Sequence, residues 1–242
     1  MSNNFEKSPR LAVLIDADNT PSKSIPHIME EITKFGTAHV RRIYGDWSSK
    51  LLSGWKDVLL DHSIQPIQQF AYTTGKNATD IAMIINAMDL MYTERFDGFC
   101  LVSSDSDFTP LAARIREQSL TVYGFGQQKT PKPFVETCDK FIYLELLGPQ
   151  STESSKAKPV TDSRLFHYFK AAIDATSNDS GWAALGGVGS HINKQAPDFD
   201  SRTWGHSKLS DLAKSIPKVE TKHSDSHFYV RIKTAKKKAD QK

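Results

Sequence analysis

The sequence predicts an α/β protein in which a parallel sheet flanked by helices is followed by a small winged-helix domain. Two observations predict this fold class. Through residues 1–147, short apolar runs typical of strands buried on both faces alternate with stretches of helical apolar spacing. Residues 148–162 have no apolar periodicity and indicate a linker, after which residues 163–233 contain three helical stretches and a terminal hairpin.

Six strands, separated by helices, are expected in the first domain. The expected strands are residues 11–15, 38–44, 63–68, 98–103, 121–125 and 140–144. The expected helices are residues 22–35, 51–60, 80–92 and 108–117. This alternation favours a parallel sheet with right-handed crossovers. A dinucleotide-binding domain is the competing interpretation, but its only glycine pair, Gly124 and Gly126, lacks the third glycine of that motif.

The second domain has a different pattern. Apolar residues at helical spacing run from Leu165 to Ile173, from Trp182 to Ile192 and from Leu209 to Ile216. Gly186-Gly187 is expected to interrupt the second helix, and Trp182 is expected on its apolar core face. Val219 and residues 228–232 predict a terminal hairpin. The lysine-rich tail, residues 234–242, is expected to be disordered.

Composition and charge limit the functional classes. Of the 242 residues 38% are hydrophobic, yet no apolar run approaches the roughly 18 residues of a membrane span, and the polar first ten residues predict no signal peptide. Two cysteines argue against a disulfide framework, which favours a cytoplasmic protein. Residues 1–147 carry 15 basic and 18 acidic residues, a net charge of −3, whereas residues 163–242 carry 14 and 8, a net charge of +6. This basic rear half favours a polyanionic partner.

Acidic residues follow the ends of the predicted strands. Asp16 comes directly after the first strand, Asp105 and Asp107 follow the fourth, and Asp80 begins an apolar helix. Ligands bind at the carboxyl ends of the strands in an open α/β sheet, and carboxylates gathered there repel one another unless a cation lies between them. Each acid alone has a structural explanation, because Asp is preferred in turns and at helix N-caps. Together they predict a site for Mg²⁺ or Mn²⁺.

At these residues the chain resembles the NYN family of PIN-like nucleases. The matching stretches are Leu14-Ile15-Asp16-Ala17-Asp18-Asn19, Gly75-Lys76-Asn77-Ala78-Thr79-Asp80 and Val102-Ser103-Ser104-Asp105-Ser106-Asp107-Phe108. The resemblance covers about residues 10–147. It implies a PIN-like parallel sheet and a divalent metal held by Asp16, Asp80, Asp105 and Asp107, with Asn19 close by. The resemblance also implies a ribonuclease, since family members are typically ribonucleases, although some relatives lack demonstrated activity.

The rear domain is similar to the OST-HTH, or LOTUS, domain. The matching stretches are residues 181–189, with Gly181-Trp182, and residues 197–209, with Trp204-Gly205-His206. Such domains are winged-helix RNA-binding or adaptor modules, so the pairing favours RNA as the partner. Arg202 and Lys208 are expected on a basic RNA-binding face, with Trp204 available for stacking.

The favoured hypothesis is a metal-dependent endoribonuclease whose metal lowers the pKa of an attacking water. Lys76 is expected to neutralise a phosphate oxygen, and Ser103 and Ser104 to contact the RNA backbone, although ordinary turn hydrogen bonding explains the serines equally well. A non-catalytic RNA-binding or adaptor protein with a metal-binding NYN domain is the alternative. DNA is a less favoured substrate, and the oligomeric state stays open, with a homo-oligomer as one option.

Overall fold

The computed structural model describes residues 8–48, 50–70, 78–148, 162–224 and 227–233. The chain divides into two compact units, Met1–Pro149 and Gln150–Lys242. The predicted linker, apart from its end residues 148 and 162, and the predicted tail at 234–242 lie outside the described residues.

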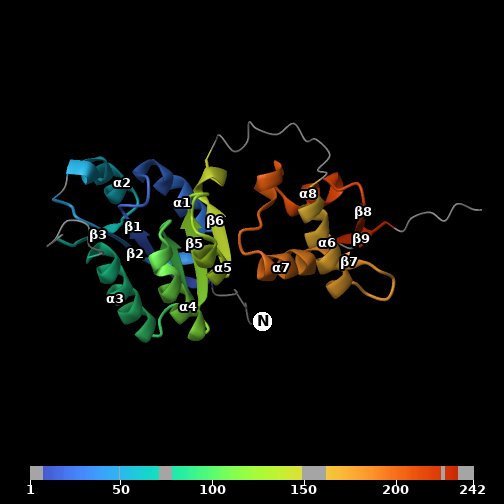
Figure 1. Cartoon of the computed structure of the whole chain (residues 1–242), viewed down its shortest axis with the longest axis horizontal. Coiled ribbons are helices and arrows are strands. Elements are labelled where there is room, and N and C mark those ends of the chain that lie inside the picture. Colours follow the sequence, from blue (N-terminus) through green and yellow to red (C-terminus); the bar gives the residue numbers. More distant parts are fainter. Residues whose placement is uncertain (1–7, 49, 71–77, 149–161, 225–226, 234–242) are drawn as a thin grey trace, which may run out of the picture. The chain divides into compact units, whose positions relative to one another are not determined.

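The first unit is built on a six-stranded, fully parallel sheet, which confirms the predicted fold class (Figure 1). Its strands are β1 (Arg10–Asp16), β2 (Thr37–Gly45), β3 (Gln65–Gln68), β4 (Gly98–Val102), β5 (Thr121–Gly126) and β6 (Lys140–Tyr143). The strand order is β3-β2-β1-β4-β5-β6, so successive connections run outward in opposite directions from β1 and β4. The point where the order reverses lies between these two central strands, and there a crevice opens at the carboxyl edge of such a sheet.

The strands β1 and β4 occupy the centre because they are apolar along nearly their whole length. All five residues of β4 and the last six of β1 are buried. Alternate β1 residues serve opposite faces: Ala12 and Leu14 join one core cluster, and Leu11, Val13 and Ile15 join the other. A strand buried on both faces needs helices on both sides, and this is what the rest of the unit supplies.

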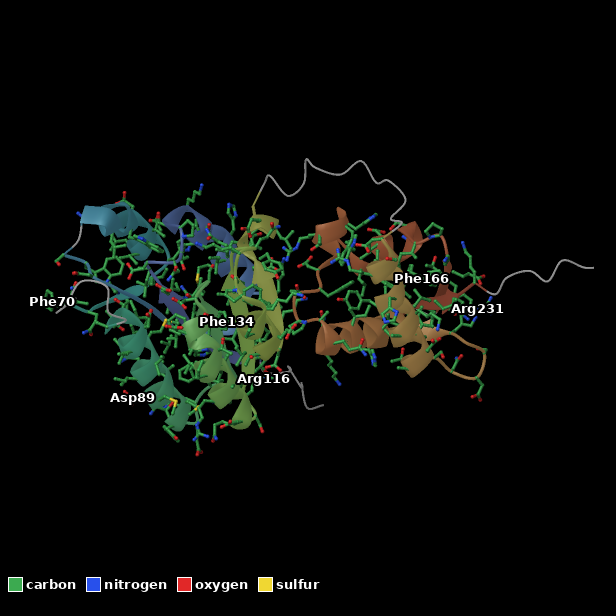
Figure 2. The ribbon with its side chains drawn as sticks, in the orientation of Figure 1. Phe70, Asp89, Arg116, Phe134, Phe166 and Arg231 are labelled. Carbon is green, nitrogen blue, oxygen red and sulfur yellow. The ribbon has the colours of Figure 1, made fainter. Side chains whose placement is uncertain are left out.

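Helices cover the two faces of the sheet in separate groups. The core cluster on the Leu14 face includes buried residues of α3 (Ala78–Tyr92), α4 (Thr109–Glu117) and α5 (Lys132–Thr137). The cluster on the Ile15 face includes residues of α1 (Ile25–Ile32) and of the 3₁₀ turn η2 (Lys50–Trp55) that leads into α2 (Lys56–Asp61). Phe134 of α5 lies inside the unit (Figure 2).

One helix of this unit differs from the sequence prediction. Helix α5 was not predicted, because its six residues include Pro133 and follow Pro131, a composition typical of a loop. The packing of Gly124 agrees with the rejection of the competing dinucleotide-binding interpretation. A Cβ on Gly124 would lie 2.4 Å from Phe141 Cδ2, so this glycine serves close packing between β5 and β6.

The second unit has a helical core closed by a three-stranded antiparallel sheet, which contains the predicted terminal hairpin and one further short strand, β7. Its helices are α6 (Ser163–Thr176), α7 (Leu185–Gln195) and α8 (Leu209–Ser215), and its sheet has the order β7-β9-β8, from Ala183–Ala184, His227–Ile232 and Val219–Ser224. Leu165, Phe169, Val188, Ile192 and Leu212 are buried in one apolar cluster.

Two predictions for the second unit were wrong. Helix α7 runs without interruption through Gly186 and Gly187, because tertiary packing of Leu185, Val188 and Ile192 outweighs the low helix propensity of glycine. Trp182 lies before this helix rather than within it, and it is half-buried rather than part of the core.

Candidate active site

We refer to the carboxyl edge of the sheet at the switch point, with Asp16, Asp80, Asp105 and Asp107, as the acidic edge. Among these residues Asp16 is held by the largest number of hydrogen bonds. Its carboxylate is only 1% exposed at the end of β1, on the same face as Ala12 and Leu14. Oδ1 accepts hydrogen bonds from the backbone N–H of Asp18 at 3.0 Å and of Asn19 at 3.3 Å. Oδ2 accepts from Asn19 Nδ2 at 2.8 Å and from Ser103 Oγ at 2.7 Å. A buried carboxylate needs such donors, and these also fix its orientation.

Ser103 links the two central strands at the switch point. Its hydroxyl donates to Asp16 and accepts from the backbone N–H of Asp105 at 3.0 Å, so the turn after β4 is tied directly to the end of β1. Ser104 is also buried, and its Oγ accepts from the Gln127 N–H at 2.9 Å after β5. In this structure both hydroxyls, predicted to contact the RNA backbone, bind protein groups that hold the turn in place.

Asp105 and Asp107 occupy the start of the next helical segment. Asp105 is the N-cap of the 3₁₀ turn Ser106–Phe108, and its Oδ1 accepts the Asp107 N–H at 2.9 Å. This turn continues into α4. Capping therefore occupies one oxygen of Asp105, while Asp107 is exposed at the mouth of the turn.

The carboxyl group of Asp80 is influenced by the charges of the other acids. It lies in the first turn of α3, a helix that covers the face on which Asp16 lies. Burial, followed by the charges of Asp16, Asp105, Asp107 and Asp18, raises the pKa of Asp80 from 3.8 to about 6. Burial is the first of these causes, and charges act over several ångströms, so the shift places Asp80 within the electrostatic reach of these acids. Asp16 and the turn that carries Asp105 are joined directly at this edge, because Ser103 Oγ donates to Asp16 and accepts from the Asp105 N–H.

Two further acids extend this edge. Asp18 has a raised pKa because of burial and of the nearby charges of Asp16 and Asp46. Asp46 directly follows β2, and its Oδ1 accepts hydrogen bonds from the Ser48 N–H at 3.1 Å and from Gln68 Nε2 at 2.9 Å. The sequence prediction did not include Asp46, although the signal that identified Asp16, an acid just past a strand, was present there too.

Carboxylate oxygens are the ligands that a hard divalent cation prefers, but the acids of this edge do not form a complete set of metal ligands in the structure. In the described ranges, no three His, Cys, Asp or Glu side chains are grouped tightly enough to hold a metal ion. The repulsion that raises the pKa of Asp80 is the repulsion that a divalent cation would relieve. Asp16, Asp80, Asp105 and Asp107 thus fit a metal in charge and donor type. Lys76, predicted to contact phosphate, lies outside the described residues.

One of the two cations predicted for the basic face of the second unit is neutralised. Arg202 forms an ion pair with Asp200, with Nη2 to Oδ2 at 2.6 Å and Nε to Oδ1 at 3.0 Å. Trp204 is half-buried, lies 5.2 Å from the Phe199 ring and donates through Nε1 to Asp162 at 3.3 Å, so its ring belongs to the edge of the core. Lys208, the other predicted RNA-binding cation, is exposed just before α8.

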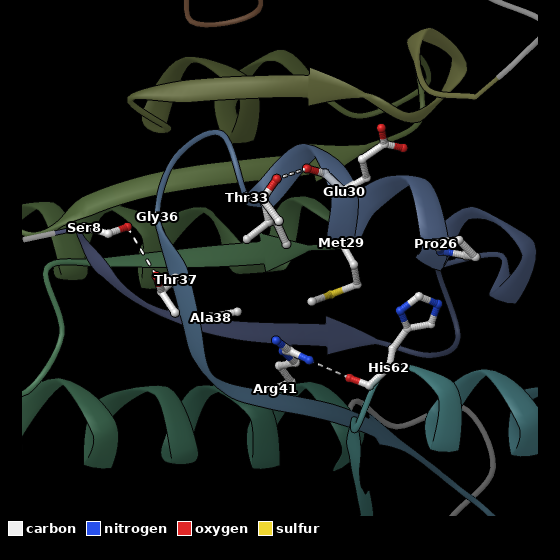
Figure 3. A pocket seen from close by; sticks show the side chains of 11 residues that line it. Ser8, Pro26, Met29, Glu30, Thr33, Gly36, Thr37, Ala38, Arg41 and His62 are labelled. Carbon is white, nitrogen blue, oxygen red and sulfur yellow. Dashed lines mark hydrogen bonds between the residues drawn. The ribbon is translucent and has the colours of Figure 1, made fainter.

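A hollow of about 510 Å³ lies elsewhere in the first unit, beside α1 and the start of β2 (Figure 3). Met29, Thr33, Thr37, Arg41 and His62 are among its lining residues. Arg41 Nη1 donates to the His62 carbonyl at 2.8 Å, so this cation is directed toward protein backbone. None of the acids that converge at the switch point lines this hollow.

The fold and the acidic switch point define a PIN-like α/β domain. A model of the NYN domain matches residues 10–145, more than half of the chain, and a model of the OST-HTH/LOTUS domain matches residues 166–230. The chain therefore belongs to the NYN family, part of the PIN-like nuclease superfamily, and carries an OST-HTH/LOTUS domain behind the NYN domain. Both resemblances seen in the sequence are confirmed, in the predicted order.

Two solved structures are similar to parts of the chain. One is a protein of unknown function from Vibrio parahaemolyticus RIMD 2210633, 16% identical, with 57% of this chain and 94% of that chain covered and a TM-score of 0.49. The other is the solution structure of residues 175–257 of a Chromobacterium violaceum protein, 33% identical, with 34% and 96% covered and a TM-score of 0.27. No curated protein matches the chain. None of the helices in the described part has the length and apolar character to cross a membrane.

Proposed function

We propose that the protein is a divalent-metal-dependent endoribonuclease, with the NYN domain as the catalytic part and the OST-HTH/LOTUS domain as the RNA-holding part. The observation that carries the proposal is the position of Asp16 and Asp105 at the switch point of the sheet, joined there through Ser103, with Asp80 close enough for the charges of these acids and of Asp107 to act on it. NYN and PIN-like nucleases generally depend on divalent metals, and OST-HTH/LOTUS domains bind RNA. Two free, buried cysteines support a cytoplasmic location.

In this proposal the four aspartates hold Mg²⁺ or Mn²⁺. The bound metal supplies Lewis-acid activation of water and neutralises charge at the scissile phosphate. Asn19 and Ser103 are positioning residues, because both donate to Asp16 Oδ2 and so set the direction of its carboxylate. Asp80 holds a proton more tightly than an ordinary aspartate and must release it to act as a ligand.

In this proposal the two units have opposite net charges that match their separate roles in cleavage and in RNA binding. The catalytic unit carries a net charge of −3 and should repel a polyanion, whereas residues 163–242 carry +6. Covalent connection to an RNA-binding domain raises the local concentration of RNA at the acidic edge. Removal of residues 148–242 should therefore weaken RNA binding more than it slows the cleavage step.

The decisive experiment compares wild type with Asp16→Asn and Asp105→Asn on labelled single-stranded and hairpin RNA, in Mn²⁺, Mg²⁺ or EDTA. Asp89→Asn is the matched control, since Asp89 is an exposed acid near the opposite end of α3 from Asp80 (Figure 2). Cleavage should require metal and fall by about 100-fold or more in the two site variants while RNA affinity stays unchanged. Asp89→Asn should cleave as wild type does.

Binding of RNA without cleavage in every metal, by wild type and variants alike, would instead identify the protein as an RNA-binding adaptor. Cleavage that persists in EDTA would exclude the metal-dependent mechanism and leave the acidic edge without its proposed role.

A further inference from the structure

The outward face of the three-stranded sheet in the second unit gathers aromatic and basic side chains. Val230 of β9 is buried, and its neighbours Ala183 and Thr221 in the register share its inward face. The side chains of Tyr229 and Arg231 therefore project to the other face, together with Lys222, which pairs with Tyr229. Arg231 is labelled in Figure 2.

Cations lie over the aromatic rings of this face. Lys222 Nζ is 4.4 Å from the centroid of the Trp182 ring and 5.5 Å from that of Tyr229. Arg231 Cζ is 4.5 Å from the Trp182 centroid. One ammonium group thus lies within cation–π distance of two rings, which makes Trp182 and Tyr229 neighbours on a half-exposed surface. We refer to Trp182, Tyr229, Lys222 and Arg231 as the wing platform.

The wing platform differs from the face next to helix α8 in that its lysine lies near two rings. On the α8 side Lys208 is exposed as well, but the cation–π contacts there, Lys214 over Phe228 and Lys218 over Phe166, involve one ring each. There, Arg202 is paired with Asp200, and Lys214 is paired with Asp211 at 3.1 Å. On the platform, Arg231 is also paired, with Glu220 at 2.7 Å, but Lys222 has no carboxylate partner in the part of the chain that the structure describes. An unpaired cation beside two adjacent rings offers a phosphate contact and two stacking surfaces within one small area.

We propose that the wing platform binds unpaired bases of single-stranded RNA, an inference that rests on the proposed RNA-holding role of this domain. Bases stack on Trp182 and Tyr229, and Lys222 moves from the rings to an adjacent phosphate. The exchange is favourable because a base stacked on an aromatic ring is typically held more strongly than an exposed cation over the same ring. A duplex hides its base faces, and an acidic peptide has no flat ring system to use the aromatic pair, so single-stranded RNA fits best.

The test measures binding of the full-length protein, in EDTA, to a fluorescent single-stranded RNA of about 12 nucleotides, to its blunt duplex and to an abasic strand of equal length. The variants are Trp182→Leu, Tyr229→Leu and Lys222→Gln, with Lys170→Gln as the matched control, because Lys170 is an exposed lysine of α6 that is paired with Asp174. Lys222→Gln removes no buried group, so it reports on the platform even if an aromatic variant loses stability, which circular dichroism would detect.

Each aromatic variant should weaken single-strand binding roughly 5-fold or more, and Lys222→Gln should reduce both the affinity and the salt dependence. Lys170→Gln should stay within about 2-fold of wild type. On the abasic strand, wild type and the aromatic variants should bind equally weakly, because stacking is then impossible.

Full affinity in all three platform variants would overturn the inference while leaving the proposed nuclease intact, since cleavage is measured separately in Mn²⁺. Displacement of the RNA by poly-glutamate would indicate an acidic-peptide surface and would also overturn it. A wild-type protein that binds no RNA and cleaves none would reject the proposed function itself.

Discussion

The two units place their charged groups by different physical means. In the NYN unit, the central acid is buried at the end of a strand and fixed by four hydrogen bonds to Asp16. In the OST-HTH/LOTUS unit, the basic groups of the wing platform lie on an outer sheet face, over aromatic rings. A fixed carboxylate suits a ligand that demands defined geometry, and mobile lysine and arginine chains suit one whose sequence and shape vary. Under the proposed function, the fixed carboxylate would serve the cleavage step and the exposed cations and rings would serve the binding of RNA.

The comparison assumes that each unit is stable through its own core, and Phe169→Ala would test this most severely. Phe169 is fully buried in the second unit, and its truncation should cost about 3–5 kcal/mol. Calorimetry should then show the transition of the second unit shifted down by more than about 10 °C, with that of the first unit unchanged. Lys170→Ala, at the exposed neighbouring position, is the control. A matching shift of both transitions would mean that the two units unfold together.

A smaller effect is expected from Asp162→Ala, which tests whether a fixed carboxylate also matters in the second unit. Asp162 caps α6 by accepting the Arg164 N–H at 2.8 Å, and this backbone bond is the main reason its pKa is lowered. The substitution should lower the free energy of unfolding by about 1 kcal/mol near neutral pH, as measured by urea denaturation. Because the folded-state pKa is depressed, the stabilisation is present above the unfolded pKa and disappears as the pH falls through the folded value. Asp162→Asn, which keeps a capping oxygen, should lose less, and an equal loss would point to packing instead.

The smallest expected effect is a change in melting temperature caused by Asp80→Asn, which tests whether the charge of Asp80 destabilises the first unit. The pKa of Asp80 is raised to about 6 in the folded protein, so its ionised form destabilises the fold. This penalty is absent below the unfolded value near 3.8 and fully present above about pH 6. In EDTA, Asp80→Asn should raise the melting temperature by about 1–2 °C at pH 7.5, a modest gain because solvent screens part of the repulsion, and by nothing at pH 4. A gain of the same size at both pH values would show that repulsion among the acids is not the cause.

The first unit was largely predictable from the sequence because its signals are local. Buried parallel strands are continuous apolar runs. Asp16 was identified because it directly follows such a run, and Asp105 because it comes three positions after the last residue of another. Their convergence follows from a topological rule, that the carboxyl ends of parallel strands share one edge. Helix α5 escaped because two prolines surround its start, and Asp46 escaped because β2, with its partly exposed arginines, is a weaker apolar run.

The second unit was predictable only in outline. The wing platform depends on antiparallel pairing that brings Trp182, which precedes β7, beside residues of β8 and β9 about 40 to 50 positions later in the chain. No local pattern encodes that register, so Trp182 was predicted as a core helix residue. Likewise, the sequence presented Arg202 as a free cation, whereas Asp200 two residues earlier neutralises it in the fold.

The placement of β1 between β2 and β4 has a consequence for the protein during its synthesis. The strand β1 can pair with β2 as soon as residue 45 has left the ribosome, but its other edge stays open until residues 98–102 emerge. The bond from Ser103 to Asp16, and with it the arrangement of the acids, can form only after that second pairing. A nascent chain therefore cannot carry the assembled acidic edge while the first 97 residues alone are exposed, and the RNA around the ribosome meets that edge only once both central strands are in place.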